Sequence, residues 1–541
     1  MGRVAGSREA RRKGALETTG FRILLAYSAC IGTLALLGPE TSPRGRSGGP
    51  GGETPSIAEA IVLAGAPSGR APGDEVDATP PVAPTGVSII EYGADPTGAR
   101  GSAAAINATL AAHRIVYAPC GTYRLESSVL LPTGRMLRGA GRCTIFVVPD
   151  VGFVGERVIT NSDIARGNAG ITISDFGVRV TGQKPVAGDN PGIIRFQKVD
   201  GLTIERIFTG GFASEYDVIH LAGGVRNATV RGCVLKNAQS THAGGGLGIY
   251  GGPAVSASYA SHGIVVSGNT IESTYDEAVA VYGWFNSVTD VQVTGNTLVN
   301  RGTTELAAGI LGSNLRQGGV VKDVAFSGNV IVGKTNILTG ASRITFVGNT
   351  ITGPLAGGQD AIFVAAASGA VPEDIVVAGN TIRGSARYGV YSEAREVTLR
   401  DNEIHGTTSY GIYGGTKIVG NLVIGAGSVG IFPTATSSVV RGNTIVGSIS
   451  GIAFYGAGHG LEISQNTIVD ATVEGVGVNG NGATVSNVTI SENVVKSSPW
   501  VVTIRGIRTH NGTFLNCVAA RNSVAGAFQD YVLAAGWQLV P

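Results

Sequence analysis

A short string of the form S-G-N-T-I recurs from residue 267 onward and limits the possible folds of this chain more than any other feature. Each copy has an alternating apolar run, such as V-Q-V-T, before its asparagine and a second apolar run after it. The asparagine is therefore expected at a bend between two strands. Successive asparagines are 19 to 33 residues apart. Strand-and-turn units repeated at such intervals predict a β-solenoid, in which each repeat forms one coil of a stack. The asparagines are Asn269, Asn296, Asn329, Asn349, Asn380, Asn402, Asn421, Asn443, Asn466 and Asn493.

The repeated asparagines are expected to be structural rather than catalytic. Asparagine tolerates left-handed backbone, and its side chain can bond the amide of a neighbouring coil. Asparagines stacked in one corner would form a ladder that satisfies polar groups inside a buried bend. Cys233 occupies the same place one coil earlier, where the asparagine stands in the later coils.

The composition agrees with a solenoid. The chain has 84 glycines and only 14% charged residues, so much of it must be buried or coated with small polar side chains. Stacked turns around a continuous core satisfy both conditions. The formal net charge of +2 is too small to attract nucleic acid, and we expect no such partner.

The first residues differ in character from the rest. Six basic residues precede the apolar run 23–38, which is the order of an export signal. Residues 1–38 are expected to be a cleaved signal peptide or an uncleaved signal anchor, and any membrane contact is expected through this segment alone. Residues 39–85 are rich in Pro, Gly and Ser and are expected to form a disordered linker before a β-helix domain over 86–541. This order predicts a secreted or cell-envelope-anchored protein and leaves its oligomeric state open.

The five cysteines give one expected disulfide. Cys120 and Cys143 are 23 residues apart, about one coil, so stacking can bring their backbones within disulfide reach. Cys233 and Cys517 lie in apolar strands and are expected to be buried free thiols.

The first part of the expected β-helix domain carries several recognisable motifs. Residues 88–98 predict a strand and turn that include Y-G-A-D-P-T-G, and a helix is expected over 102–112. The strings A-P-C-G-T-Y-R-L (118–125) and L-P-T-G-R-M-L-R-G-A-G (131–141) follow. Together these motifs resemble the N-terminal portion of the pectate-lyase superfamily. The resemblance implies an all-β fold, a right-handed single-stranded parallel β-helix with a short N-terminal capping helix.

A third strand in each coil reads G-I-x-V and gives an expected register. Strand side chains alternate, so the third position of each aligned segment should point into the core and the fourth outward. The inward column is Ile219, Ile249, Val279, Ile310, Ile337, Ile362, Val390, Ile412, Ile431, Ile452 and Val476. The outward column is His220, Tyr250, Ala280, Leu311, Leu338, Phe363, Tyr391, Tyr413, Phe432, Ala453 and Gly477.

The aromatic members of the outward column predict a polysaccharide-binding stripe. An exposed apolar stripe marks a binding surface, and aromatic faces suit the C–H faces of sugar rings. The expected contacts are Tyr250, Phe363, Tyr391 and Tyr413. The alternative is that loops or a partner chain cover these rings.

Acidic residues near one end of the same face are the candidate catalytic groups. Asp217 and Glu277 are expected two coils apart in one column, about 9–10 Å, near the upper limit for the carboxyl pair of an inverting glycosidase. Asp276 neighbours Glu277, and two adjacent residues cannot both face the groove on a regular strand. The remaining candidates are His220 and Asp360 for catalysis, and Tyr275, Tyr282 and Arg387 for substrate binding.

Three functions remain open from the sequence. Glycosidic hydrolysis with Asp217 and Glu277, or Asp276, as the acid/base pair is the leading one. A uronan lyase or C5-epimerase would use His220 and Tyr282 for proton transfer, and the resemblance to pectate-type lyases makes Ca²⁺ a possible cofactor. The third is a non-catalytic glycan-binding or adhesive solenoid, in which the acids bond turn amides.

Overall fold

The computed structural model describes residues 86–541 apart from residues 150, 182–191, 211–216, 238–244, 253–255, 275, 303, 313–317, 354–358, 367–369, 385–386 and 502. The expected export segment (1–38) and linker (39–85) lie outside the described residues. Within the described ranges, no helix is long and apolar enough to cross a bilayer.

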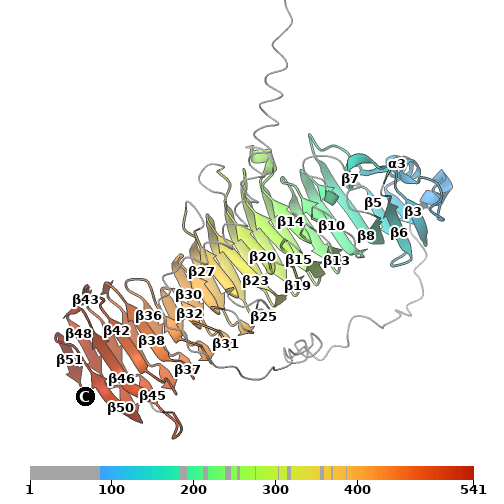
Figure 1. The fold of residues 1–541 in the computed structure, drawn as a ribbon. Helices are drawn as coiled ribbons and strands as arrows, with labels where there is room; N and C mark the ends of the chain where they lie inside the picture. The colour runs from blue at the N-terminus through green and yellow to red at the C-terminus, as the bar shows by residue number, and fades with distance from the viewer. Residues whose placement is uncertain are drawn as a thin grey trace, which may run out of the picture. The chain divides into compact units, whose positions relative to one another are not determined.

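The described chain forms a parallel β-helix, in which successive coils stack their strands into long sheets (Figure 1). One sheet has 32 strands, a second has 16, and a third has three, β39 (Gly458–His459), β43 (Thr484–Ser486) and β47 (Thr513–Leu515). The 16-stranded sheet contains the G-I-x-V strands and carries the candidate site. Its strands are β4 (Ser127–Leu131), β7 (Val154–Asn161), β9 (Gly192–Phe196), β11 (Ile219–Leu221), β14 (Leu247–Tyr250), β17 (Val279–Tyr282), β20 (Leu306–Leu311), β23 (Lys334–Leu338), β26 (Ile362–Ala365), β29 (Val390–Ser392), β32 (Ile412–Tyr413), β35 (Val429–Phe432), β38 (Ser450–Tyr455), β42 (Glu474–Asn479), β46 (Thr503–His510) and β50 (Ala527–Val532).

The N-terminal end is covered by the expected helix, α3 (Ala103–Ala112), whose Ile106 and Leu110 are fully buried against the first coil (Figure 1). The strand expected at the start of 88–98 is only two residues long, β1 (Val87–Ser88). It is followed by a 3₁₀ helix, η1 (Ile89–Tyr92), because Ser88 and Glu91 form a capping box that starts a helical turn.

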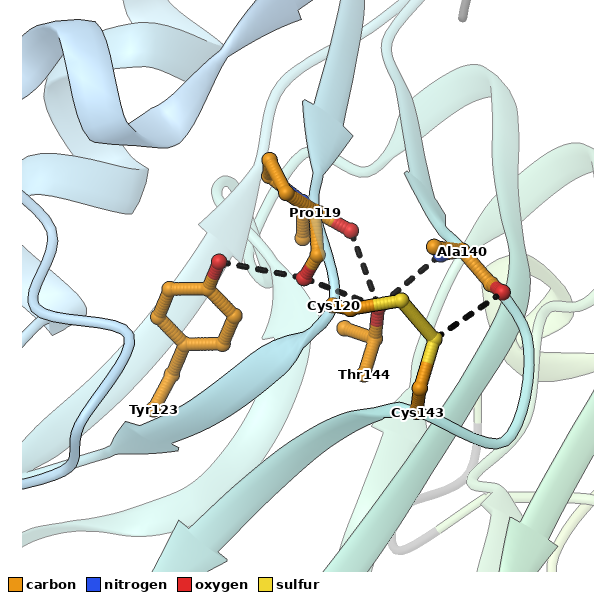
Figure 2. The surroundings of a disulfide bond; sticks show 7 residues. Pro119, Cys120, Tyr123, Ala140, Cys143 and Thr144 are labelled. Atoms are coloured by element: carbon orange, nitrogen blue, oxygen red, sulfur yellow. Dashed lines mark hydrogen bonds between the residues drawn. A yellow bond between two sulfur atoms is a disulfide. The ribbon is translucent and has the colours of Figure 1, made fainter.

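The expected disulfide joins Cys120 to Cys143, with their Cα atoms 4.8 Å apart (Figure 2). The Thr144 hydroxyl beside it accepts a hydrogen bond from the Ala140 amide and donates to a carbonyl of the preceding coil. Cys233 and Cys517 are buried free thiols, as expected.

The asparagine ladder is confirmed and extends one step further, to Asn522. At each step the Oδ1 atom of one asparagine accepts from both the backbone amide and the Nδ2 group of the asparagine before it, as Asn421 does from Asn402. Cys233 fills the first step, because its backbone amide donates to Asn269 Oδ1. The expected left-handed backbone lies one residue earlier than predicted. The residue before each asparagine has a positive φ, 62° at Gly268 and 55° at Asp401.

All eleven residues of the expected inward column are fully buried, so the assignment of inside and outside is correct. The expected alignment between coils is wrong in one region. His220 pairs with Gly248 rather than Tyr250, and Tyr250 pairs with Tyr282. A shift of two residues keeps every side chain on its own face, so the pattern of buried and exposed residues does not reveal it. The other shifted pairs are Ala280 with Gly309 and Asn336 with Phe363.

Candidate functional site

The outer face of the 16-stranded sheet brings Asp217 and Glu277 into one column, as expected. Ile219 pairs with Leu247, and Leu247 pairs with Val279, so the residues two positions before them align as well. Backbone bonds from Val218 to Gly245 and from Gly246 to Glu277 hold this alignment. Two coils of a β-helix separate the backbones of the two acids by about 9–10 Å.

Asp217 is the centre of a buried polar cluster. Its Oδ2 atom accepts from the Tyr250 hydroxyl and lies 2.9 Å from His220 Nδ1, while its Oδ1 atom accepts from the Gly245 amide at 3.2 Å. The His220 and Tyr250 rings are stacked with centroids 4.5 Å apart. Burial lowers the pKa of His220, so the imidazole is neutral near pH 7 and holds the carboxylate in place without adding charge.

Glu277 lies in a different environment. Its side chain is buried, accepts a hydrogen bond from the Tyr282 hydroxyl and contacts Asp276. Burial and the neighbouring Asp276 carboxyl raise the pKa of Glu277 well above its usual value, and burial also raises that of Asp276. The contact between these adjacent acids corrects the expectation that they must face apart, because the regular strand begins only at Val279.

Two glycines provide the space for these carboxyl groups. A Cβ atom on Gly248 would lie 2.3 Å from Asp217 Oδ2, and one on Gly309 would lie 2.6 Å from Glu277 Oε1. Each acid therefore folds across the outer face and over a residue without a side chain. The sequence shows these glycines only as members of the repeated G-I wording, and it gives no sign of which acid they accommodate.

Trp284 belongs to the same cluster and was missed from the sequence. Its ring centroid lies 5.0 Å from that of Tyr250 and 6.5 Å from that of Tyr282. It lies in the connection after β17, outside the repeated strand wording, so no periodic signal identifies it.

Asp360 is in a separate cluster. It lies three coils from Glu277, about 14 Å along the stack, and forms a bidentate ion pair with Arg387 at 2.9 Å. Lys334, also missed from the sequence, donates to Gln359 Oε1 at 2.7 Å. Burial lowers the pKa of Lys334, although the nearby Glu305 and Asp360 oppose this.

The aromatic residues of the outward column stack on one another, so their ring faces are not open to solvent. Phe363, Tyr391, Tyr413 and Phe432 form a ladder with centroids 5.1, 4.9 and 5.3 Å apart and interplanar angles of 11°, 3° and 3°. Tyr388 and Tyr410 form a second, parallel stack at 5.0 Å. These separations match the spacing of neighbouring strands, so each interior ring has both faces covered and only its edge half-exposed. The predicted contact between sugar faces and ring faces is therefore wrong for Tyr391 and Tyr413.

Replacing Tyr413 by Ala should therefore lower stability. The variant loses stacking with Tyr391 and Phe432, and we expect unfolding free energy to fall by about 2 kcal/mol. Thermal unfolding followed by circular dichroism measures this. The matched variant is Tyr455→Ala, since among the described residues Tyr455 makes a single ring contact, edge-on with Phe432. An unchanged melting temperature together with weaker polysaccharide binding would restore the original interpretation.

Family comparison places the chain among known β-helix proteins. A model described as rhamnogalacturonase A/epimerase, pectate lyase-like, matches residues 86–299, and one described as right handed beta helix region matches residues 337–524. The chain is a pectate-lyase-like, right-handed parallel β-helix protein. A comparison of this β-helix protein with curated proteins finds no match.

Solved structures similar to this β-helix protein include a glucanase, a mannuronan epimerase and a bacteriophage tailspike. The catalytic unit of a GH87 α-1,3-glucanase from Streptomyces thermodiastaticus is 18% identical, with 84% of this chain and 70% of that chain covered and a TM-score of 0.39. The A-module of the Azotobacter vinelandii mannuronan C-5 epimerase AlgE4 is 16% identical, with 84% and 99% covered and a TM-score of 0.30. The tailspike of E. coli bacteriophage HK620 is 15% identical, with 71% and 76% covered and a TM-score of 0.46. At these identities the likeness concerns the fold alone.

The described acids of the β-helix protein do not fit a Ca²⁺ site. Among the residues that the structure describes, no group of three or more His, Cys, Asp or Glu side chains is placed to hold a metal ion. The Asp217 oxygens are engaged by His220, Tyr250 and a backbone amide, and those of Asp360 by Arg387.

The remaining candidates of the β-helix protein are distributed along the face. Tyr275 lies outside the described residues. Tyr282 is in the acidic cluster, and Arg387 lies over the Tyr388 ring, 4.5 Å from its centroid. The structure thus joins Asp217, His220, Tyr250, Asp276, Glu277 and Tyr282 in one site and separates Asp360, Phe363, Arg387, Tyr391 and Tyr413 from it.

Proposed function

We propose that this β-helix protein is an exported, secreted or envelope-anchored enzyme that hydrolyses glycosidic bonds of a polysaccharide. Glu277 acts as general acid and Asp217 as general base. The contrast between the two carboxyl environments carries the proposal. Glu277 has a raised pKa and a neighbouring acid, which favours its protonated form, whereas Asp217 accepts hydrogen bonds suited to a carboxylate. Carboxyl groups with environments that differ in this way supply the acid and base of a glycosidase.

The spacing supports an inverting reaction. Two coils separate the backbones of Asp217 and Glu277 by about 9–10 Å, and inverting enzymes hold their two carboxyl groups about 6.5–9.5 Å apart to fit a water molecule. Glu277 gives its proton to the oxygen of the leaving sugar as the glycosidic C–O bond breaks. Asp217 takes a proton from the water whose oxygen bonds to the anomeric carbon.

The surrounding residues orient these groups. His220 is neutral and fixes Asp217 through Nδ1. The hydroxyl of Tyr250 donates a hydrogen bond to Asp217, and that of Tyr282 donates one to Glu277. Trp284 packs beside both tyrosines and provides an apolar wall. The matching family description names enzymes of polysaccharide chemistry, which supports this substrate class.

A panel of neutral and uronic polysaccharides, with products identified by mass spectrometry, tests the proposal. Hydrolysis should yield reducing ends and products heavier by one water per bond cleaved. Products that absorb in the ultraviolet as unsaturated uronides would instead identify a lyase. Binding of a polysaccharide with no change in its length or composition would favour the adhesive function.

A uronan lyase or C5-epimerase is the second candidate. Lys334 favours it, because burial lowers the pKa of this amine and so favours the neutral form, which can accept a proton from carbon. His220 and Tyr282 are the other proton-transfer candidates. Epimerisation would change the uronate composition of the polymer without changing its length, so nuclear magnetic resonance of the same products distinguishes it.

A further inference from the structure

Asn300, the last residue of β19 (Thr297–Asn300), occupies a place that glycine fills in the later coils. The pairing of β19 with β22 (Val330–Val332) puts Asn300 in register with Gly333, and the column continues along the stack. The glycines of this column that have a positive φ are Gly333, Gly384, Gly406, Gly425 and Gly447. Those coils leave the strand without using a side chain, so the turn alone does not require asparagine at residue 300.

The buried side chain of Asn300 bonds the backbone of two neighbouring coils. It is 3% exposed. Its Nδ2 group donates to the Asp276 carbonyl at 2.7 Å and to the Leu306 carbonyl at 2.9 Å. Its Oδ1 atom accepts from the Gly302 amide at 2.7 Å. The bond to Asp276 reaches the preceding coil, whereas the other two stay within the coil of Asn300 itself. The side chain therefore acts as a clamp between the coils.

Both carbonyl groups held by this clamp belong to segments that define the position of Glu277. Asp276 is the residue before Glu277, so its carbonyl is part of the peptide group that leads into this acid. Leu306 is the first residue of β20, and Gly309 of the same strand leaves the space into which the Glu277 carboxyl group folds. The clamp thus holds the segment that carries Glu277 against the segment over which its side chain lies.

The groups around Glu277 make its ionisation sensitive to this arrangement. Its closest titratable neighbours are Asp276, which contacts it, and Tyr282, whose hydroxyl donates to it. The other titratable groups that interact with this pair of acids are Asp217, Tyr250 and, as the cation among them, Lys334. Separation of Asp276 from Glu277, or entry of water between them, would favour the ionised form of Glu277.

We propose that Asn300 is a positioning residue of the acidic site, which holds Asp276 against Glu277 and Glu277 over Gly309. It acts through backbone carbonyls. The clamp stands on the hydrogen bonds alone, and only its effect on turnover rests on the proposed function. A residue that departs from a regular repeat and uses its buried polar groups on a neighbouring coil is typical of a functional site.

Asn300→Gly tests the clamp, because glycine fills this place in the later coils and the fold should accept it. We expect kcat to fall about tenfold to hundredfold with KM nearly unchanged, since a displacement of about 1 Å at a reacting group has an effect of this size. The alkaline limit of activity should move to lower pH. Glu277 would lose part of the burial and of the contact with Asp276 that keep it protonated.

The matched control is Asn107→Ala in the first coil. Asn107 makes bonds of the same kind, from its Nδ2 group to the Ser128 carbonyl and to its Oδ1 atom from the Leu130 amide, both at 2.8 Å. Its loss removes a clamp between α3 and β4, so neither kcat nor the pH profile should change.

A double-mutant cycle with Asp276→Asn separates positioning of the acid pair from a general loss of stability. Asp276→Asn already removes the charge beside Glu277. Asn300→Gly should therefore move the alkaline limit less in this background than in the parent protein.

Trp284 fluorescence gives a readout that does not require turnover. The Trp284 ring lies 6.5 Å from that of Tyr282, which bonds Glu277. A pH titration, corrected with Trp284→Phe for the other tryptophans, should give a midpoint that Asn300→Gly lowers. A lowered midpoint without turnover of any polysaccharide would support the clamp and contradict the proposed hydrolysis. The clamp is wrong if Asn300→Gly behaves like Asn107→Ala in kcat and midpoint, or if the shifts of the cycle are fully additive.

Discussion

Glu277→Gln and Asp217→Asn are each expected to lower polysaccharide turnover by about 10³-fold. General acid–base catalysis by a positioned side chain contributes roughly 10²–10⁴-fold, and an amide keeps the shape of the carboxyl group without its proton or charge. Initial rates of reducing-end formation measure the effect. Asp323→Asn removes a carboxylate from the 32-stranded sheet and should leave the rate unchanged.

The pH dependence gives this prediction a second readout. Glu277 is active when protonated, and its pKa is raised by burial and by Asp276. Activity should persist above the usual pKa of a glutamic acid and fall as pH passes the raised value. Asp276→Asn removes the neighbouring charge and lowers the pKa of Glu277, so the alkaline fall should move to lower pH. If both single amide variants retain full turnover, these acids have only a structural role.

Asn402→Ala is expected to reduce the free energy of unfolding by about 4 kcal/mol. The side chain accepts from the amide and the Nδ2 group of Asn380, and it donates to the Val377 carbonyl and to Asn421. Its removal leaves several buried polar groups without partners, and each costs about 1–3 kcal/mol, partly relieved by local relaxation. Urea denaturation with the disulfide intact provides the measurement.

Asn522→Ala is the matched variant at the end of the ladder. Asn522 is half-buried, and its side chain accepts hydrogen bonds from Asn493 and donates one to the Ile490 carbonyl, so its loss should be about half as large. A loss below about 1 kcal/mol for Asn402→Ala would show that water replaces the ladder bonds.

The regular parts of the fold could be predicted from the sequence because their signals are local and repeated. The strand–asparagine–strand wording predicted the coils and the ladder, and alternation predicted the buried column from Ile219 to Val476. A spacing of one coil predicted the Cys120–Cys143 disulfide. The column that contains Asp217 and Glu277 was also predicted correctly. The expected register was wrong by two residues at β14, first in one direction and then in the other, so the two errors cancelled between β11 and β17.

Only the tertiary structure decided how side chains meet across coils. Tyr250 pairs with Tyr282 instead of the expected Ala280, a register shift of two residues between neighbouring strands. Such a shift leaves the pattern of buried and exposed residues unchanged. The contact of Asp276 with Glu277 depends on a bend before β17. Trp284 lies in the connection after β17, and Lys334 lies at the irregular pairing of β20 with β23, so no repeated sequence pattern identifies either residue.

The aromatic stripe shows the division most clearly. By itself the sequence determined that Phe363, Tyr391, Tyr413 and Phe432 lie on one outward column. The structure decided that their faces contact each other, because neighbouring strands are spaced at about the distance of two stacked rings. Sequence alternation determines the side of the sheet on which a side chain lies. The separation and register of the coils determine what that side chain contacts.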